Sequence, residues 1–97
     1  MVLRFEGVLW EYEGEAPWVF VTMPVEDATM IRETVPPKSG FGSIRVEVTL
    51  GETTWKTSIF PDRDSGSYVL PVKRMVREAE GVEPGDSVKV EFLVVDG

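Results

Sequence analysis

The sequence contains two similar stretches, and this internal repeat constrains the fold more than any other feature. The first begins at Met23-Pro24-Val25 and continues to the alternating segment 42–47. The second begins at Leu70-Pro71-Val72 and continues to the alternating segment 86–91. Each copy has the pattern of a strand end, a proline, one short helix, a turn and a strand. Because neither copy can bury its apolar face alone, the repeat predicts two similar halves that share one core.

Alternation of apolar and polar residues predicts the strands. Residues 3–12 and 18–23 have the pattern of one hairpin, and residues 44–50 and 55–60 have that of a second, around the turn Gly51-Glu52. Turn-forming residues predict a loop over 61–66. A brief strand over 68–70 and a last strand over 88–94 complete the set.

Each repeat also predicts one short helix, started by a proline. Apolar spacings of three and four give each helix a face to bury, and Gly81 is placed to end the second helix in a left-handed conformation. The predicted buried residues are Val25, Ala28, Ile31 and Val35 in the first helix, and Val72, Met75, Val76 and Ala79 in the second.

About six strands, two short helices and a pseudo-twofold repeat favour a mainly β fold, a closed or double-split β-barrel, because closure removes exposed strand edges. At 97 residues the chain has the size of one domain, predicted to span 1–97. The start of the sequence lacks the long apolar run of a signal peptide, and no stretch has the ~18 apolar residues that span a bilayer. We therefore expect a cytoplasmic protein that does not enter a membrane.

The amino-acid composition limits the catalytic and metal-binding chemistry that the chain can perform. The chain has no histidine and no cysteine, so it lacks the usual general base near neutral pH, the commonest metal ligand and a thiolate nucleophile. No catalytic spacing, phosphate-binding loop or dinucleotide fingerprint is present in the sequence. We therefore expect no catalytic residue, no metal and no cofactor.

Charge is distributed unevenly along the chain. The net charge of −7 argues against nonspecific binding to nucleic acid or anionic membranes. Residues 38–77, however, carry seven basic and four acidic side chains, whereas the segments on both sides are acidic. This positive middle is either a solvated face or a site for an anion.

The candidate binding residues lie in that middle segment. Cationic groups beside hydroxyls and aromatic rings suit a small carboxylate or phosphate ligand. If the strands are neighbours, one face would hold Arg45, Lys56, Ser58, Tyr68 and Lys73. A lid or rim would come from Phe41, Trp55 and Phe60. The alternative is that the aromatic residues belong to the core or rim and that the lysines are merely solvated.

Three consecutive motifs, Gly40 to Val46, Trp55 to Pro61 and Ser65 to Lys73, resemble a bacterial and archaeal family known as domain of unknown function nineteen-oh-five. The resemblance implies a compact barrel related in architecture to AbrB-type and MazE-type regulators. It implies no established activity, cofactor or catalytic residue. AbrB-type proteins typically build the barrel from two chains, whereas both halves are present here. We therefore expect a monomer that is a pseudo-dimer within one chain.

The leading functional hypothesis is a noncatalytic module that binds a small anionic ligand or a protein segment. The first alternative is a DNA-binding regulator of AbrB-like architecture, in which Lys73, Arg74 and Arg77 contact phosphates. A small enzyme of unknown reaction is the second alternative.

Overall fold

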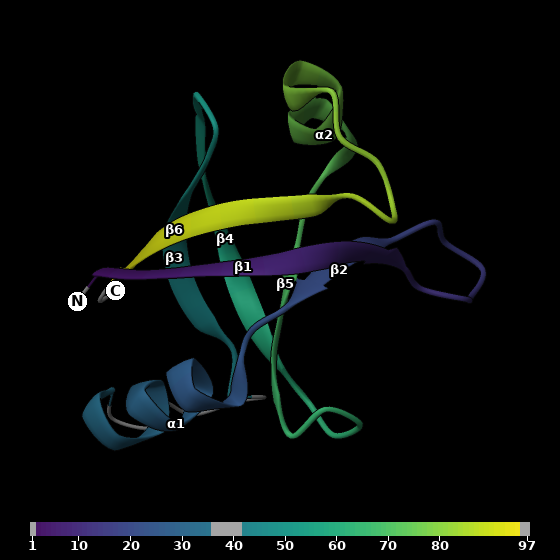
Figure 1. Ribbon diagram of the computed structural model, residues 1–97. Helices are drawn as coiled ribbons and strands as arrows, with labels where there is room; N and C mark the ends of the chain where they lie inside the picture. The colour runs from purple at the N-terminus through teal and green to yellow at the C-terminus, as the bar shows by residue number, and fades with distance from the viewer. Residues whose placement is uncertain (1, 36–41, 96–97) are drawn as a thin grey trace.

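The computed structural model describes residues 2–35 and 42–95, which form six strands and two helices. Their bounds are β1 (Val2–Glu11), β2 (Val19–Thr22), α1 (Val25–Thr34), β3 (Ile44–Leu50), β4 (Thr53–Asp62), β5 (Ser67–Pro71), α2 (Arg74–Glu80) and β6 (Ser87–Val94). The strands pair antiparallel in the order β1-β2-β5-β4-β3-β6, and β6 pairs with β1 to close the barrel (Figure 1). The predicted mainly β barrel with two short helices is confirmed.

The strand pairing follows the internal repeat. The barrel order is unchanged when β1, β2 and β3 are exchanged for β4, β5 and β6. In the aligned repeats, Met23 corresponds to Leu70 and Val21 to Tyr68. Val21 pairs with Leu70, and the backbone N–H of Met23 donates to the Tyr68 carbonyl at 2.9 Å. Exchanging the two halves converts one of these pairs into the other, so one chain supplies both halves of the closed barrel.

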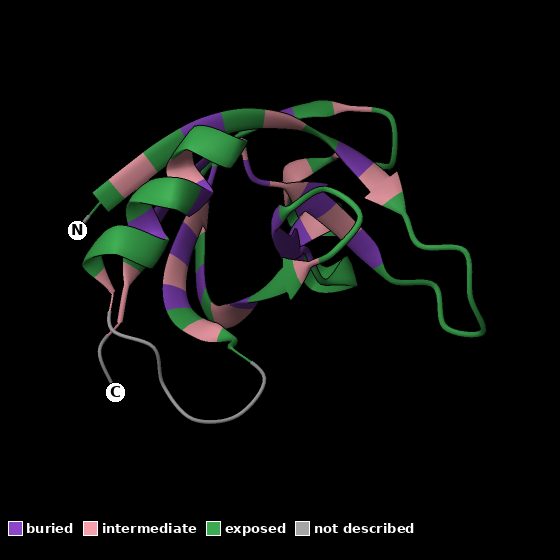
Figure 2. Cartoon of the chain, turned by 90° about the horizontal axis from the view of Figure 1, so that it is seen from below, coloured by how far each residue is buried: buried purple, intermediate pink, exposed green. Residues whose placement is uncertain are grey.

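The core lies inside the barrel and under the two helices. Buried residues alternate with exposed ones along most strands, as Figure 2 shows by colour. Ala28 and Ile31 cover the barrel from α1, and Val76 covers it from α2 at the opposite end (Figure 1). Between them, Phe5 and Phe92 meet edge to face with ring centroids 6.0 Å apart. Neither described helix is long and apolar enough to cross a membrane.

The predicted helix faces are only partly correct. Val72 and Val76 are buried, but Met75 is 69% exposed and Ala79 is exposed as well. The helix α2 has only 7 residues, and Val76 is its buried residue. Met75 precedes Val76 and is rotated from it by ~100° about the helix axis, so its side chain points away from the barrel. In α1, Val25 is likewise 53% exposed.

Of two predicted element ends, one is confirmed and the other differs. Gly81 does end α2 in the left-handed conformation, with φ 66°. The predicted loop over 61–66 is shorter than expected, because β4 continues through Pro61 and Asp62, which pair with Tyr68 and Ser67 of β5. Pro61 is tolerated because it lies near the end of its strand, where a missing N–H interrupts little of the ladder.

Candidate functional site

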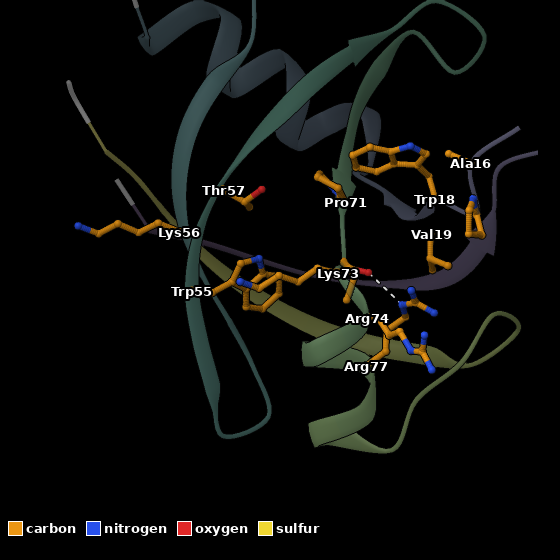
Figure 3. Close-up of a pocket in the computed structure, with 12 residues that line it drawn as sticks. Ala16, Trp18, Val19, Trp55, Lys56, Thr57, Pro71, Lys73, Arg74 and Arg77 are labelled. Carbon is orange, nitrogen blue, oxygen red and sulfur yellow. Dashed lines mark hydrogen bonds between the residues drawn. The ribbon is translucent and has the colours of Figure 1, made fainter. Parts of the chain in front are cut away.

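A cleft of about 460 Å³ opens beside the start of α2 (Figure 3). Segments far apart in the sequence line it: residues 16–19 from the β1–β2 connection and β2, 55–57 from β4, 71–74 leading into α2, and Arg77. Its volume is in the range of small-molecule sites, roughly 300–1,000 Å³.

The base of the cleft is apolar and fixed by the barrel. Val19 and Val72 are 2% and 1% exposed, and the backbone N–H of Val72 donates to the Val19 carbonyl at 2.9 Å. Trp55 opposes Val48 in the β3–β4 ladder and packs into the core with only 9% of its surface exposed. These contacts give the cleft a rigid base.

Three cationic side chains stand around this base at the start of α2. The side chain of Lys73 reaches toward Trp55, and those of Arg74 and Arg77 extend from α2 in the direction of Val19 (Figure 3). Arg77 donates its Nε–H to the Val72 carbonyl at 3.0 Å, which fixes the guanidinium and leaves its two terminal amino groups to other partners. Arg74 forms an exposed ion pair with Glu78 at 3.0 Å.

The fourth cation of the lining is placed differently. Lys56 lines the cleft from β4, but its ammonium group points away from the other labelled residues (Figure 3). Glu47 is its partner in the β3–β4 ladder, on the same face of the sheet. Lys56 therefore contributes its aliphatic stem to the cleft lining more than its positive charge.

The lining contains no acidic side chain among the described residues, although the protein carries a net charge of −7. Four of its ten basic side chains line this one cleft. Positive groups beside an apolar wall act through a lower effective dielectric than bulk water, which strengthens their attraction for an anion. The arrangement can therefore bind an anion that also has an apolar part.

The other end of the barrel, under α1, also carries an arginine, but its guanidinium is bound to the protein. There, Arg32 of α1 donates to the Gly66 carbonyl at 2.7 Å, and its guanidinium carbon lies 5.5 Å from the centre of the Tyr68 ring. These contacts hold the β4–β5 connection against α1.

The structure distributes the predicted site residues over different places. Arg45 opposes Ser58 in the β3–β4 ladder, and Lys56 lies on the same outer face. Lys73 lies at the start of α2 and lines the cleft, as the stem of Lys56 also does. Tyr68 is 7% exposed and lies under Arg32 at the α1 end, away from the cleft.

The predicted rim residues are also separated. Trp55 lines the cleft, whereas Phe60 is 42% exposed and is not part of the lining. Phe41 lies outside the described residues. Sequence reasoning missed Trp18 as a cleft residue, because no local pattern indicates which part of the barrel the start of β2 lies beside.

Within residues 2–35 and 42–95, no group of three or more acidic side chains is arranged to hold a metal ion, and the chain has no histidine or cysteine. Thr57 provides the one side-chain hydroxyl of the described lining.

The fold and its cleft define a small closed β-barrel domain with a cationic groove at one end. A family model described as "Domain of unknown function (DUF1905)" matches residues 5–92, and the chain belongs to this family. No curated protein matches the chain.

Proposed function

We propose that this domain is a noncatalytic binding module that holds a small anionic ligand in the cleft at the start of α2. The observation that carries the proposal is the composition of the lining, with cations and indoles but no carboxylate in the described part of an acidic chain. Charge-assisted hydrogen bonds from guanidinium and ammonium groups are the usual means of holding carboxylate and phosphate oxygens.

The three cations at the start of α2, Lys73, Arg74 and Arg77, have complementary roles. Arg77 is oriented by its bond to the Val72 carbonyl, so little side-chain freedom is lost when a ligand binds its terminal amino groups. Lys73 is exposed and can follow the ligand as a mobile point charge. Arg74 would exchange its weak surface pair with Glu78 for the ligand, since exposed ion pairs contribute only about 0–1 kcal/mol.

Thermal denaturation and titration calorimetry with pyrophosphate test the proposal. Saturation at a hundredfold excess over the dissociation constant should stabilise the fold by about 2.7 kcal/mol. Lys73→Gln and Arg74→Gln should each weaken binding by about tenfold, the effect of losing ~1.4 kcal/mol from one charge-assisted bond. Arg45→Gln is the matched control, because Arg45 is an exposed cation on β3 outside the cleft.

Two results would contradict the proposal. One is the absence of any stabilisation by pyrophosphate, inorganic phosphate or citrate. The other is equal weakening by Arg45→Gln and Lys73→Gln, which would indicate attraction to overall charge and not to a site. Retardation of duplex DNA at low salt that is lost in Lys73→Gln would instead favour the DNA-binding alternative.

A further inference from the structure

Trp18 is an exposed indole that the protein nevertheless holds in one place. It is 53% exposed, yet its ring stacks on Phe20 with an interplanar angle of 9° and centroids 6.1 Å apart. Phe20 in turn contacts the rings of Trp10 at 5.2 Å and Tyr12 at 6.4 Å. One face of Trp18 is thus supported by a cluster of rings on the outside of the β1–β2 hairpin.

The backbone of Trp18 is fixed as well. Its N–H donates to the Ala16 carbonyl at 2.9 Å, and its carbonyl accepts from the N–H of Tyr12 at 2.8 Å. An exposed aromatic residue on an unsupported loop would lose conformational freedom when a ligand stacks on it. The backbone and ring of Trp18 are already held in place before binding. Stacking of a ligand on this ring therefore costs less conformational entropy.

The supported indole borders the cleft. Trp18 lines the cleft (Figure 3), whereas Phe20 does not. Because Trp18 is 53% exposed, the stack on Phe20 leaves part of its surface available to a ligand. Lys73 and Arg77 stand on the α2 side of the same cleft, across the apolar base. A ring surface and a cationic cluster are therefore presented together to one ligand.

Resting on the proposed function, we propose that the ligand is an anion that carries a planar ring, a nucleoside phosphate by chemical class. Its base stacks on Trp18, and its phosphate oxygens accept hydrogen bonds from Lys73 and Arg77. Base–aromatic stacking adds affinity with little dependence on which base is bound. The cleft, at about 460 Å³, has the volume of a small-molecule site.

Calorimetry with matched probes tests this inference. Adenosine 5′-monophosphate and ribose 5-phosphate carry the same phosphomonoester and differ in the base. We expect the nucleotide to bind roughly tenfold more tightly or better, as one stacking contact provides. Trp18→Leu should reduce its affinity to that of ribose 5-phosphate, while ribose 5-phosphate and pyrophosphate bind as before. Tyr12→Leu is the matched control, because Tyr12 belongs to the same ring cluster but does not line the cleft.

The outcomes separate this inference from the proposed function. Equal affinities for the nucleotide and ribose 5-phosphate, or full nucleotide affinity in Trp18→Leu, would overturn the ring contact. Pyrophosphate binding that remains sensitive to Lys73→Gln would then still support the anion site. If none of these probes binds, both the inference and the proposed function are overturned. Thermal unfolding of each variant checks that lost binding is not lost folding.

Discussion

The carboxylate of Glu80, the last residue of α2, accepts a hydrogen bond from the Thr53 hydroxyl at 2.5 Å. The same carboxylate also accepts from the backbone N–H of Glu52 at 3.3 Å, and Gly51 lies so close that a Cβ there would collide with it. The end of α2 is thereby attached to the turn of the β3–β4 hairpin, whose return strand carries Trp55. This attachment fixes the cationic start of the helix relative to the base of the cleft.

Glu80→Ala should destabilise the protein by about 1–2 kcal/mol, because it removes an acceptor from two donors of the hairpin turn. It should also weaken pyrophosphate binding, since α2 becomes less well positioned. Urea denaturation measures the first effect and calorimetry the second. Glu83→Ala removes the same charge from an exposed position just after α2 and should change stability by less than about 0.5 kcal/mol. Equal losses in the two variants would refute the structural role of Glu80.

Ser67→Ala should destabilise the fold by about 1–2 kcal/mol, because it leaves a buried carbonyl without its partner. The Ser67 hydroxyl is buried and donates to the Met23 carbonyl at 2.7 Å, which joins the start of β5 to the first residue after β2. Chemical denaturation measures the loss, and Ser43→Ala at an exposed position serves as the control. A Ser67→Ala protein as stable as Ser43→Ala would contradict this assignment.

Gly7→Ala should destabilise the barrel by about 1–3 kcal/mol through overpacking. A Cβ at Gly7 would lie 2.7 Å from the Cγ2 atom of Val21, whose side chain is fully buried. Val21→Ala is destabilising by itself but provides room for the added methyl group. The double variant should therefore be more stable than the sum of the two single losses predicts, which a double-mutant cycle measures. Simple additivity would show that the two residues do not meet.

The stability of the fold should depend on pH through Asp27. Burial raises the pKa of the Asp27 carboxyl above its ordinary value of 3.8, and the neighbouring Glu26 carboxylate raises this pKa further. The folded state then holds the proton more tightly than the unfolded state. The stabilisation from this group is present below pH 3.8 and is lost as the pH rises through the folded-state pKa.

Asp27→Asn removes this titration. As the pH rises above about 3.8, the unfolded natural protein ionises at Asp27 more readily than the folded one does. The unfolding free energy of the variant should therefore rise relative to that of the natural protein. Urea denaturation over a pH series measures this difference, and the other carboxyl groups, common to both proteins, largely cancel. A difference that stays constant or shifts in the opposite direction would contradict the raised pKa.

Much of the barrel could be predicted because its strands are marked by local alternation of residues and because that pattern occurs twice. The alternation of Val46, Val48 and Leu50 places these residues on one face of a strand, and the structure buries all three. The repeat then relates this strand to β6, where Val88 and Val90 are buried in the same way. The presence of two copies of one pattern also favoured a barrel with two similar halves, which the structure shows.

The cleft could not be predicted in the same way, because its residues meet only through barrel closure. Tyr68 and Lys73 are close in sequence, yet they lie near opposite ends of β5. Tyr68 contacts Arg32 of α1, whereas Lys73 lines the cleft beside α2. Nothing in the spacing of Trp18 indicates that β2 pairs with β5 and brings this indole beside α2. Ladder neighbours such as Arg45 and Ser58 were predictable, since one hairpin relates them.

The two ends of the barrel differ, and their difference has a consequence for how such a protein can evolve. In a barrel assembled from two identical polypeptides, any substitution that opens one mouth opens the other too. Fusion of both lobes into a single chain removes that obligation. Arg32 can hold the β4–β5 connection against α1 at one end, while the cleft at the α2 end, with Trp18 in its lining, is free to change which ligand it prefers.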